Sequence, residues 1–410
     1  MNYTAPMATS AKHKWEFKAR FRAGAFGWRS QPAITRIRQA VAEITKIAKK
    51  DPELAAEGAI QFLERVSAAL AQVDSSSGAI GSAVNHAVAE FAAIIGAAKV
   101  DPPTRRDWLE RLWLAYMNDQ IPYIESVGDY WGELCGSKEI ASEWADRLVD
   151  GLRENWTSRE HHYYKGTPNC LGAMVTAERY SEVMDLLKLA PYRTWNHCQF
   201  GVKALAAQGK IVDAVRFAEE GRGLNDGWDV VAHACEELLL SAGMVDEAYR
   251  RYGVSANRGG TYLATFRAVA KRYPHKAAAE ILADLVRSTP GDEGKWFAAA
   301  KEASLFDEAL TLASRAPCDP RTLTRAARDH AEKQPAFAVG AGLLALRWLA
   351  EGYGYEITPA DVWAAYGSTM AAAKQHGTEV ETKARIRKLV EADSKATRLM
   401  TKILGSEMRS

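Results

Sequence analysis

The sequence lacks the residue patterns that mark most metal-dependent and catalytic proteins. Its five cysteines are scattered over 410 residues without a CxxC pair, and no two histidines have the HxxxH spacing. A structural zinc site needs roughly four such ligands close together, so we expect no metal site. There is also no GxxxxGK, GxSxG or HExxH motif and no kinase motif set. We therefore expect no cofactor and no catalytic residue.

Long apolar runs and strand-like alternation are also missing. The longest apolar run, residues 337–346, ends at Arg347 and is far shorter than the roughly 20 residues of a membrane-spanning helix. We expect no membrane segment. Because unpaired, scattered cysteines are typical of a reducing compartment, we expect a cytoplasmic location. Val, Ile and Thr are sparse in runs and Ala is abundant, which predicts an all-α fold.

The sequence does contain a repeated motif, in which an acidic residue is followed by a small one. Residues 242–252 carry it most clearly, residues 303–310 are a near copy, and residues 208–215 and 177–184 are looser copies. The small residues Val183, Ala214, Ala248 and Ala309 are 31, 34 and 61 residues apart. The long gap predicts a further unit at Ala279, and Ala338 marks a sixth. A period of this length is typical of one helix–turn–helix hairpin.

The positions around these small anchor residues predict how each unit packs. A bulky apolar residue lies three positions before the anchor, and we expect it to staple the turn. Ser181, Asp246 and Asp307 are predicted N-caps of the second helix. Thirteen positions before the anchor is a predicted core position, which is occupied by Cys170, Cys235, Phe266 and Trp296.

This motif resembles that of the tetratricopeptide (TPR) family over roughly residues 167–345. The family's Trp and Leu-Gly positions in the first helix are mostly absent here. The resemblance implies a right-handed superhelix whose concave groove binds a peptide or a partner protein. The predicted organisation is an arm at 1–32, a helical region at 33–160, the repeat array at 161–345 and capping helices at 346–410.

The predicted N-terminal arm is strongly basic and rich in aromatic residues. Residues 11–50 contain eleven Lys or Arg and two acids, a net charge of +9, whereas the whole protein carries +2 and the remainder therefore −7. Basic charge beside aromatic rings is typical of nucleic-acid contacts. A solvated or partner-bound tail is the other interpretation, and we expect the arm to be flexible. The nucleic-acid candidates are Lys12, Lys14, Trp15, Lys18, Arg20, Arg22, Trp28, Arg29, Arg36 and Arg38.

The first helices of the repeats provide a second set of candidates. In a TPR-like array these helices line the groove, and five charged residues share nearly one phase on them: Lys203, Glu237, Arg267, Lys295 and Arg325. Our leading hypothesis is a non-enzymatic scaffold that binds a protein or peptide partner in this groove. The alternative is a nucleic-acid-binding helical solenoid, as found among some DNA-repair proteins, that uses the basic arm and the groove.

Overall fold

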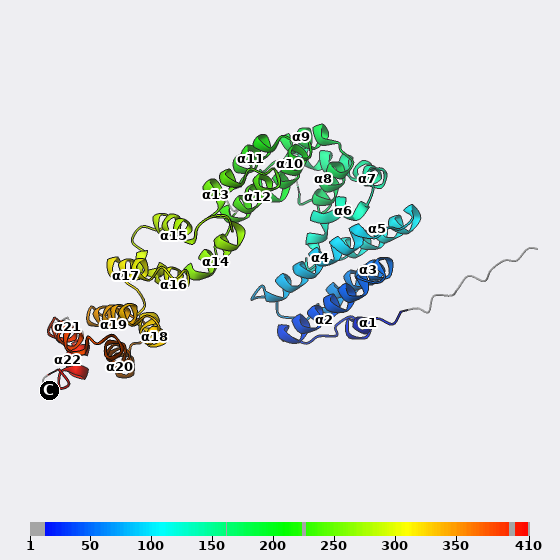
Figure 1. Ribbon diagram of the computed structural model, residues 1–410. Helices are drawn as coiled ribbons and strands as arrows, with labels where there is room; N and C mark the ends of the chain where they lie inside the picture. The colour runs from blue at the N-terminus through cyan, green and yellow to red at the C-terminus, as the bar shows by residue number, and fades with distance from the viewer. Residues whose placement is uncertain (1–12, 161, 224–226, 393–397, 409–410) are drawn as a thin grey trace, which may run out of the picture. The chain divides into compact units, whose positions relative to one another are not determined.

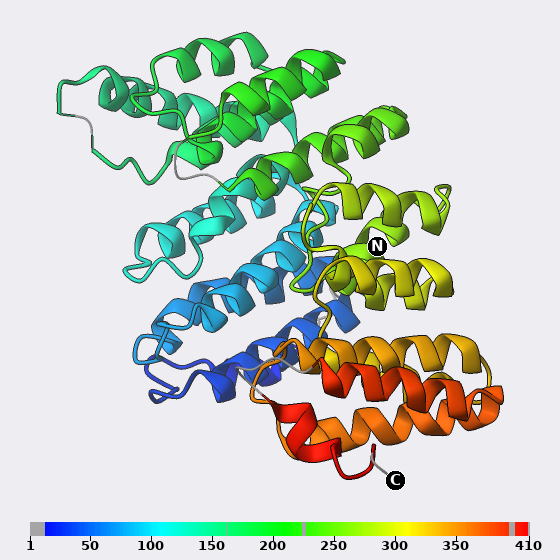
Figure 2. The same ribbon diagram turned by 90° about the vertical axis from the view of Figure 1, so that its left-hand side faces the viewer.

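The computed structural model describes residues 13–160, 162–223, 227–392 and 398–408, and over these residues the protein is all-α (Figures 1 and 2). It is 72% helical, and none of the described residues lies in a strand. Each helix packs mainly against helices close to it in the sequence, as in a helical repeat. The predicted all-α class is confirmed.

The chain folds as two compact units, Met1–Gly227 and Trp228–Ser410. The division lies inside the stretch 161–345 that the sequence predicts as one repeat array. The helices of the first unit are α1 (Glu16–Arg20), α2 (Ser30–Ala48), α3 (Pro52–Ala69), α4 (Ala79–Ala97), α5 (Pro102–Met117), η1 (Glu125–Tyr130), α6 (Trp131–Cys135), α7 (Lys138–Thr157), α8 (Thr167–Thr176), α9 (Tyr180–Lys188), α10 (Trp195–Ala207) and α11 (Ile211–Glu220). Those of the second unit are α12 (Trp228–Ser241), α13 (Val245–Tyr252), α14 (Tyr262–Arg272), α15 (Ala278–Arg287), η2 (Glu293–Trp296), α16 (Phe297–Glu302), α17 (Phe306–Arg315), α18 (Pro320–His330), α19 (Pro335–Ala350), α20 (Pro359–His376), α21 (Glu379–Glu391) and α22 (Leu399–Leu404).

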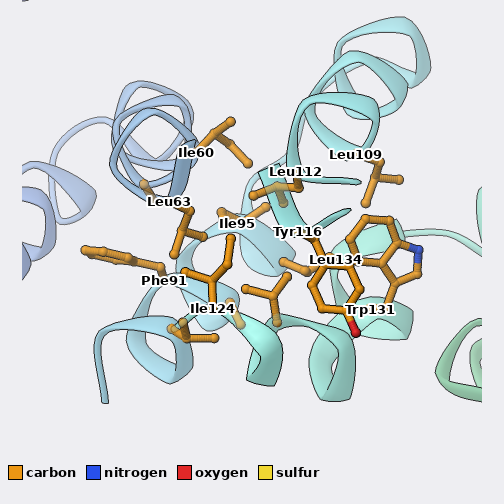
Figure 3. Close-up of a cluster of buried hydrophobic side chains, with 14 of the residues drawn as sticks. Ile60, Leu63, Phe91, Ile95, Leu109, Leu112, Tyr116, Ile124, Trp131 and Leu134 are labelled. Carbon is orange, nitrogen blue, oxygen red and sulfur yellow. The ribbon is translucent and has the colours of Figure 1, made fainter. Parts of the chain in front are cut away.

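The core of the first unit lies between α3, α4, α5, α6 and the 3-10 helix η1. Figure 3 shows buried side chains from these elements, among them Leu63, Ile95 and Leu112, converging on one apolar cluster. Trp131 is fully buried there, with its ring 4.9 Å from that of Trp144. Since each buried large apolar side chain contributes about 1.5–3 kcal/mol, this cluster is the main source of stability in the unit.

Residues 13–21 belong to this core, so the flexible arm predicted for residues 1–32 is wrong for this segment. Trp15, Phe17 and Phe21 are at most 3% exposed. The rings of Phe17 and Phe21 lie 5.7 and 4.8 Å from the ring of Phe62. The helix α1 is short, so its aromatic residues do not form the long apolar stripe that marks a packed helix in a sequence. Each buried aromatic ring nevertheless removes a large apolar area from water. Residues 1–12 lie outside the described residues.

The same segment is also held through its backbone. The Glu43 carboxylate accepts hydrogen bonds from the N–H groups of Glu16 and Phe17 at 2.8 and 3.3 Å. Further along, the Gly24 N–H donates to the Ala68 carbonyl at 2.9 Å. The N-terminal segment is therefore fixed to both α2 and the end of α3.

Helix α4 is the one helix among the described residues that is long and apolar enough to cross a membrane by composition. Its buried residues, which include Val84, Val88 and Phe91, pack against α2 and α3. Packing within the unit accounts for this apolar face, so the composition is weak evidence of a membrane span.

In the second unit, α12–α13, α14–α15 and α16–α17 are successive helix pairs. Helices α18, α19 and α20 then pack mutually, and α21 and α22 pack against α19 and α20. The Trp348 indole N–H donates to the Ala313 carbonyl at 2.9 Å, which joins α19 to α17. These contacts link neighbouring repeats in sequence order.

The turn between the two helices of a repeat has the same backbone geometry in four units. Glu178, Gly209, Gly243 and Ser304 are left-handed, with φ of 58, 75, 74 and 60°. At Gly209, its N–H donates to the carbonyl three residues earlier and the next N–H to the carbonyl five residues earlier, at 2.9 and 3.0 Å. The other three turns have the same pair of bonds. This is a Schellman motif, which satisfies the last carbonyls of the first helix.

The same turn occurs beyond the predicted array. Gly377 has φ of 72° and the same two hydrogen bonds, and Thr382, five residues later, is buried in α21. The pair α20–α21 thus repeats the hairpin geometry within the predicted capping region 346–410. Thr382 lies 44 residues after Ala338 (382 − 338), so a search for a period near 30 misses it.

Five of the six predicted anchors are confirmed, and one is wrong. The five are the fourth residues of their helices and are 0% exposed: Val183, Ala214, Ala248, Ala309 and Ala338. Ala279 is instead the exposed second residue of α15, and Ile281 is the buried fourth residue. Residues 277–279 are all alanine, so the sequence does not distinguish the buried face of the helix from its exposed face. The predicted anchor is therefore two residues before the observed one.

The predicted N-caps Ser181, Asp246 and Asp307 are wrong, because each lies two residues after the observed N-cap. The second helices begin at Tyr180, Val245 and Phe306, and the residues before them make no side-chain capping bond. The Schellman turn leads directly into the next helix, so the residue at the capping position already donates its N–H to the preceding helix. Ser181, Asp246 and Asp307 therefore lie within the first turn, where the helix dipole favours the two acids.

We expect Gly58→Ala to destabilise the protein by about 1–3 kcal/mol through overpacking. A Cβ at Gly58 would lie 2.3 Å from Trp15 Cζ2, so the added methyl group must displace the indole. In a Trp15→Ala background the same change should cost nothing further. Chemical unfolding of the two single variants and the double variant measures this coupling. Gly81→Ala on α4, where a Cβ meets no atom within 4 Å, is the control. Equal stability of Gly58→Ala and the parent would contradict the packing.

We expect Ser304→Gly to raise the free energy of unfolding by about 0.5–1 kcal/mol, because glycine tolerates a left-handed backbone that costs other residues about 1–2 kcal/mol. Gly209→Ala should have the opposite sign, since a Cβ there meets no atom within 4 Å and only backbone strain changes. Thermal melts compare the two, with Ser304→Ala as a near-neutral control. A destabilised Ser304→Gly variant would show that the serine side chain holds the turn.

We expect Ala248→Leu to cost about 1–3 kcal/mol, because the anchor lies fully buried between two helices. Ala279→Leu makes the same change at an exposed position and should alter stability by less than about 0.5 kcal/mol. Unfolding curves for the two variants would refute the assigned phase if they shift equally.

Candidate functional site

The Lys and Arg side chains of residues 13–50, on and around α1 and α2 of the first unit, are here called the basic face. Figure 1 labels α1 and α2 near the N-terminal, blue end of the chain. Residues 13–50 contain ten Lys or Arg and two acids. Both acids are already engaged: Glu16 pairs with Arg20 at 3.1 Å, and Glu43 accepts the backbone bonds at the start of α1. Within the part of the chain that the structure describes, nine of the ten cations have no carboxylate within ion-pair distance. They are Lys14, Lys18, Arg22, Arg29, Arg36, Arg38, Lys46, Lys49 and Lys50.

The predicted nucleic-acid residues divide into three groups. Trp15 is buried, so its ring cannot stack on a base, and Lys12 lies outside the described residues. Lys18 and Arg20 are half-buried. The remaining candidates are exposed: Lys14, Arg22, Trp28, Arg29, Arg36 and Arg38.

Trp28 is the aromatic side chain that this face presents to solvent. Its side chain is 72% exposed, while its backbone carbonyl accepts a hydrogen bond from the Asp74 N–H at 2.9 Å. The adjacent Arg29 is exposed and unpaired. A fixed backbone with an outward indole beside a cation is suited to stacking on an unpaired base.

The five predicted groove residues are divided between the two units. Lys203 belongs to the first unit, where its charge acts on Asp129. The other four belong to the second unit, and two of them form ion pairs between successive first helices: Glu237 of α12 with Arg272 of α14, and Arg267 of α14 with Glu302 of α16. Lys295 pairs locally with Asp292 at 2.8 Å, and Arg325 donates to Thr322 Oγ1 at 3.1 Å.

A buried carboxylate strengthens the same junction between α12 and α14. Glu236 is 0% exposed and accepts hydrogen bonds from the Tyr273 hydroxyl and Asn257 Nδ2, each at 2.6 Å. The Arg272 guanidinium lies 3.3 Å away. A buried carboxylate with this many donors is a structural group that joins repeats, and its charge is not available to a ligand.

A pocket of about 480 Å³ lies in the first unit, between the ends of several helices. We call it the acidic–aromatic pocket because its lining combines two carboxylates with four large aromatic side chains. Among the described residues that line it there is no lysine or arginine. The lining residues are Asn85, Pro122, Glu125, Ser126, Asp129, Trp156, His162, Tyr163, Tyr164, Thr167, Pro168, Pro191, Tyr192, Asn196 and His197.

The two carboxylates are held by η1, whose tight turns place residues 125 and 129 on the pocket. The Tyr163 hydroxyl donates to Glu125, and Gln199 Nε2 donates to Asp129 Oδ1 at 3.1 Å. A Cβ at Gly128 would lie 2.7 Å from Pro168 Cγ, so glycine lets η1 approach the start of α8 this closely. The position of Asp129 therefore depends on packing between η1 and α8.

The cost of burying the Asp129 carboxylate is only partly offset by its neighbours. Loss of water around the carboxylate raises the pKa of Asp129, and the nearby Glu125 raises it further. Lys203 and the bond from Gln199 lower the pKa but do not cancel the rise. A positive charge beside the Asp129 carboxylate would therefore favour its ionised form, which burial disfavours.

Sequence analysis missed this pocket. Two carboxylates four residues apart, Glu125 and Asp129, follow Pro122 in a short segment without helical periodicity, and the pair Tyr163-Tyr164 follows the end of α7. Neither the pair of carboxylates nor the pair of tyrosines is by itself a signal of a binding site in the sequence. Only the fold brings residues between positions 85 and 197 to one cavity.

The cysteines are part of the core. All five are buried and none forms a disulfide, and the predicted core position is confirmed by burial of Cys170, Cys235, Phe266 and Trp296. Burial raises the pKa of the Cys135, Cys170 and Cys318 thiols to about 12. These thiols are therefore protonated at neutral pH and are poor nucleophiles. Over the described residues, no group of three or more His, Cys, Asp or Glu side chains could hold a metal ion.

Comparison with protein-family models and with curated proteins finds no match to this chain.

Proposed function

We propose that this chain is a TPR-like helical-repeat protein that binds nucleic acid through the basic face of α1 and α2. The observation that carries the proposal is the set of nine cations on residues 13–50 that have no acidic partner among the described residues. Elsewhere among the described residues about half of the arginines pair with carboxylates, as Arg106 does with Glu143 and Arg147 with Glu110. Unpaired cations on one face are what a polyanion requires.

The distribution of charge supports a localised contact. Residues 11–50 carry +9 and the remainder of the chain carries −7, so the excess positive charge is concentrated in the N-terminal helices. The exposed stripe of α2 includes Arg38, Lys46 and Lys49, which lie on the face opposite Ile34, Ile37 and Ile44. A helix that buries one side in the core and presents cations on the other holds them in fixed positions along a phosphate backbone.

The TPR-like part of the proposal rests on the repeated turn and the buried anchors. Four units share the left-handed turn residue five positions before a fully buried Val or Ala. Such hairpins stack side by side in solenoids, and a right-handed superhelix is the arrangement we propose for them.

A protein or peptide partner in a concave groove stays a prediction. It receives less support than nucleic-acid binding, because Glu237, Arg267 and Lys295 are already paired within the chain. The proposed function is binding alone and includes no chemical step.

We expect Arg38→Gln with Lys46→Gln to weaken binding to duplex DNA and to reduce the slope of log affinity against log salt by about one for each phosphate that is no longer neutralised. Trp28→Ala should weaken binding to a single strand more than to a duplex, because only unpaired bases can stack on the indole. Fluorescence anisotropy with labelled single strands and duplexes, at several salt concentrations, measures both effects.

The matched control is Lys99→Gln with Arg159→Gln, which removes the same charge from exposed positions elsewhere in the first unit. This control should keep the parent's affinity and salt slope. Absence of binding by the parent protein at low salt, or equal loss in the two double variants, would refute the proposal. Since Trp15 lies in the core, its substitution is a test of folding and not of binding.

A further inference from the structure

We propose that the acidic–aromatic pocket of the first unit binds an organic cation through an ammonium group. The proposal is independent of the basic face, which has the opposite charge and lies on other elements. It rests on three features of the pocket: its carboxylates, its aromatic walls and the absence of lysine and arginine from its described lining residues.

The carboxylates provide the charge. Glu125 and Asp129 both line the cavity, and each has one hydrogen-bond donor from the protein, Tyr163 and Gln199 respectively. A carboxylate accepts hydrogen bonds at about four lone-pair positions, so each retains acceptor capacity. Lys203, whose charge acts on Asp129, is not among the lining residues, and no lysine or arginine of the part of the chain that the structure describes lines the cavity.

The aromatic side chains provide the second attraction. Trp156, Tyr163, Tyr164 and Tyr192 line the same cavity, and Tyr163 and Tyr192 are 74% and 67% exposed. Large aromatic rings left this exposed beside a pocket gain from being covered by a ligand. The faces of aromatic rings attract ammonium groups, most strongly when water is excluded, and quaternary ammonium ligands are commonly recognised in this way.

The size of the cavity is consistent with a small molecule or a side chain. Its volume of about 480 Å³ lies within the range of roughly 300–1,000 Å³ that ligand pockets occupy. A metal ion fits less well than an organic cation, since over the described residues no group of three or more metal-ligating side chains comes together. The chemistry therefore favours a bulky, weakly hydrated cation over a compact, strongly hydrated one.

The decisive comparison uses two probes of the same shape and different charge. Choline carries a trimethylammonium group, and 3,3-dimethylbutan-1-ol replaces the ammonium nitrogen with carbon. We expect the full-length protein to bind choline at least about tenfold more tightly than the alcohol, because only choline gains from the carboxylates and the ring faces. Titration calorimetry, or quenching of tryptophan fluorescence, measures both affinities.

The variants assign the binding to this pocket. Asp129→Asn should reduce choline affinity by about tenfold or more and leave affinity for the alcohol unchanged. It should not lower the melting temperature, because Asn can still accept from Gln199 and the charge it removes is one that burial disfavours. Asp150→Asn, which removes an exposed acid from α7 in the same unit, is the matched control and should bind choline as the parent does.

A further arm separates the two sources of an ammonium group. A short peptide containing trimethyl-lysine that binds more tightly than choline identifies the ligand as a polypeptide side chain, whereas equal or weaker binding identifies a free small cation. Either outcome supports the proposed chemistry. Equal affinity for choline and the alcohol, no binding of choline at tens of millimolar, or no effect of Asp129→Asn in a folded variant would overturn it.

Discussion

The close approach of two helices at a small buried residue is the constraint on which the repeats depend. In four units the first helix ends in a left-handed residue, and the chain enters the second helix at once. Five residues later a valine or alanine with no exposed surface lies between the helices. Since the turn satisfies the terminal carbonyls with backbone alone, it leaves the side chains of each hairpin free to contact neighbouring repeats.

Those side chains are used in two different ways. In the second unit, Glu237, Arg272 and Arg267 form ion pairs from one first helix to the next, and buried Glu236 reinforces the junction. Each exposed pair contributes little to stability, about 0–1 kcal/mol, but together they neutralise the surface charge. In α1 and α2 of the first unit the cations have almost no such partners, so their charge remains available for binding.

The first unit thus combines two surfaces of opposite charge. Its N-terminal helices carry unpaired cations, and its acidic–aromatic pocket carries Asp129, whose burial is only partly offset by Lys203 and Gln199. Uncompensated charge lowers stability unless a ligand supplies the missing partner. Both surfaces are held on rigid supports: the cations of α2 by the isoleucines on its opposite face, and the carboxylates by the contact of Gly128 with Pro168.

The sequence alone determined the helical class and most repeat positions, because helical periodicity and turn glycines such as Gly209 and Gly243 are local signals. It placed the turns before Val183 and Ala309, but it did not show that Glu178 and Ser304 have a left-handed backbone, because packing imposes there a conformation that the residue itself disfavours. It also could not separate Ala279 from Ile281, since the phase depends on which face meets the neighbouring helix. Tertiary structure alone decided that Trp15 packs over Gly58 instead of facing solvent. It likewise decided that Glu125, Asp129, Trp156 and Tyr192 share one cavity, because contacts between residues far apart in the sequence leave no periodic trace in it.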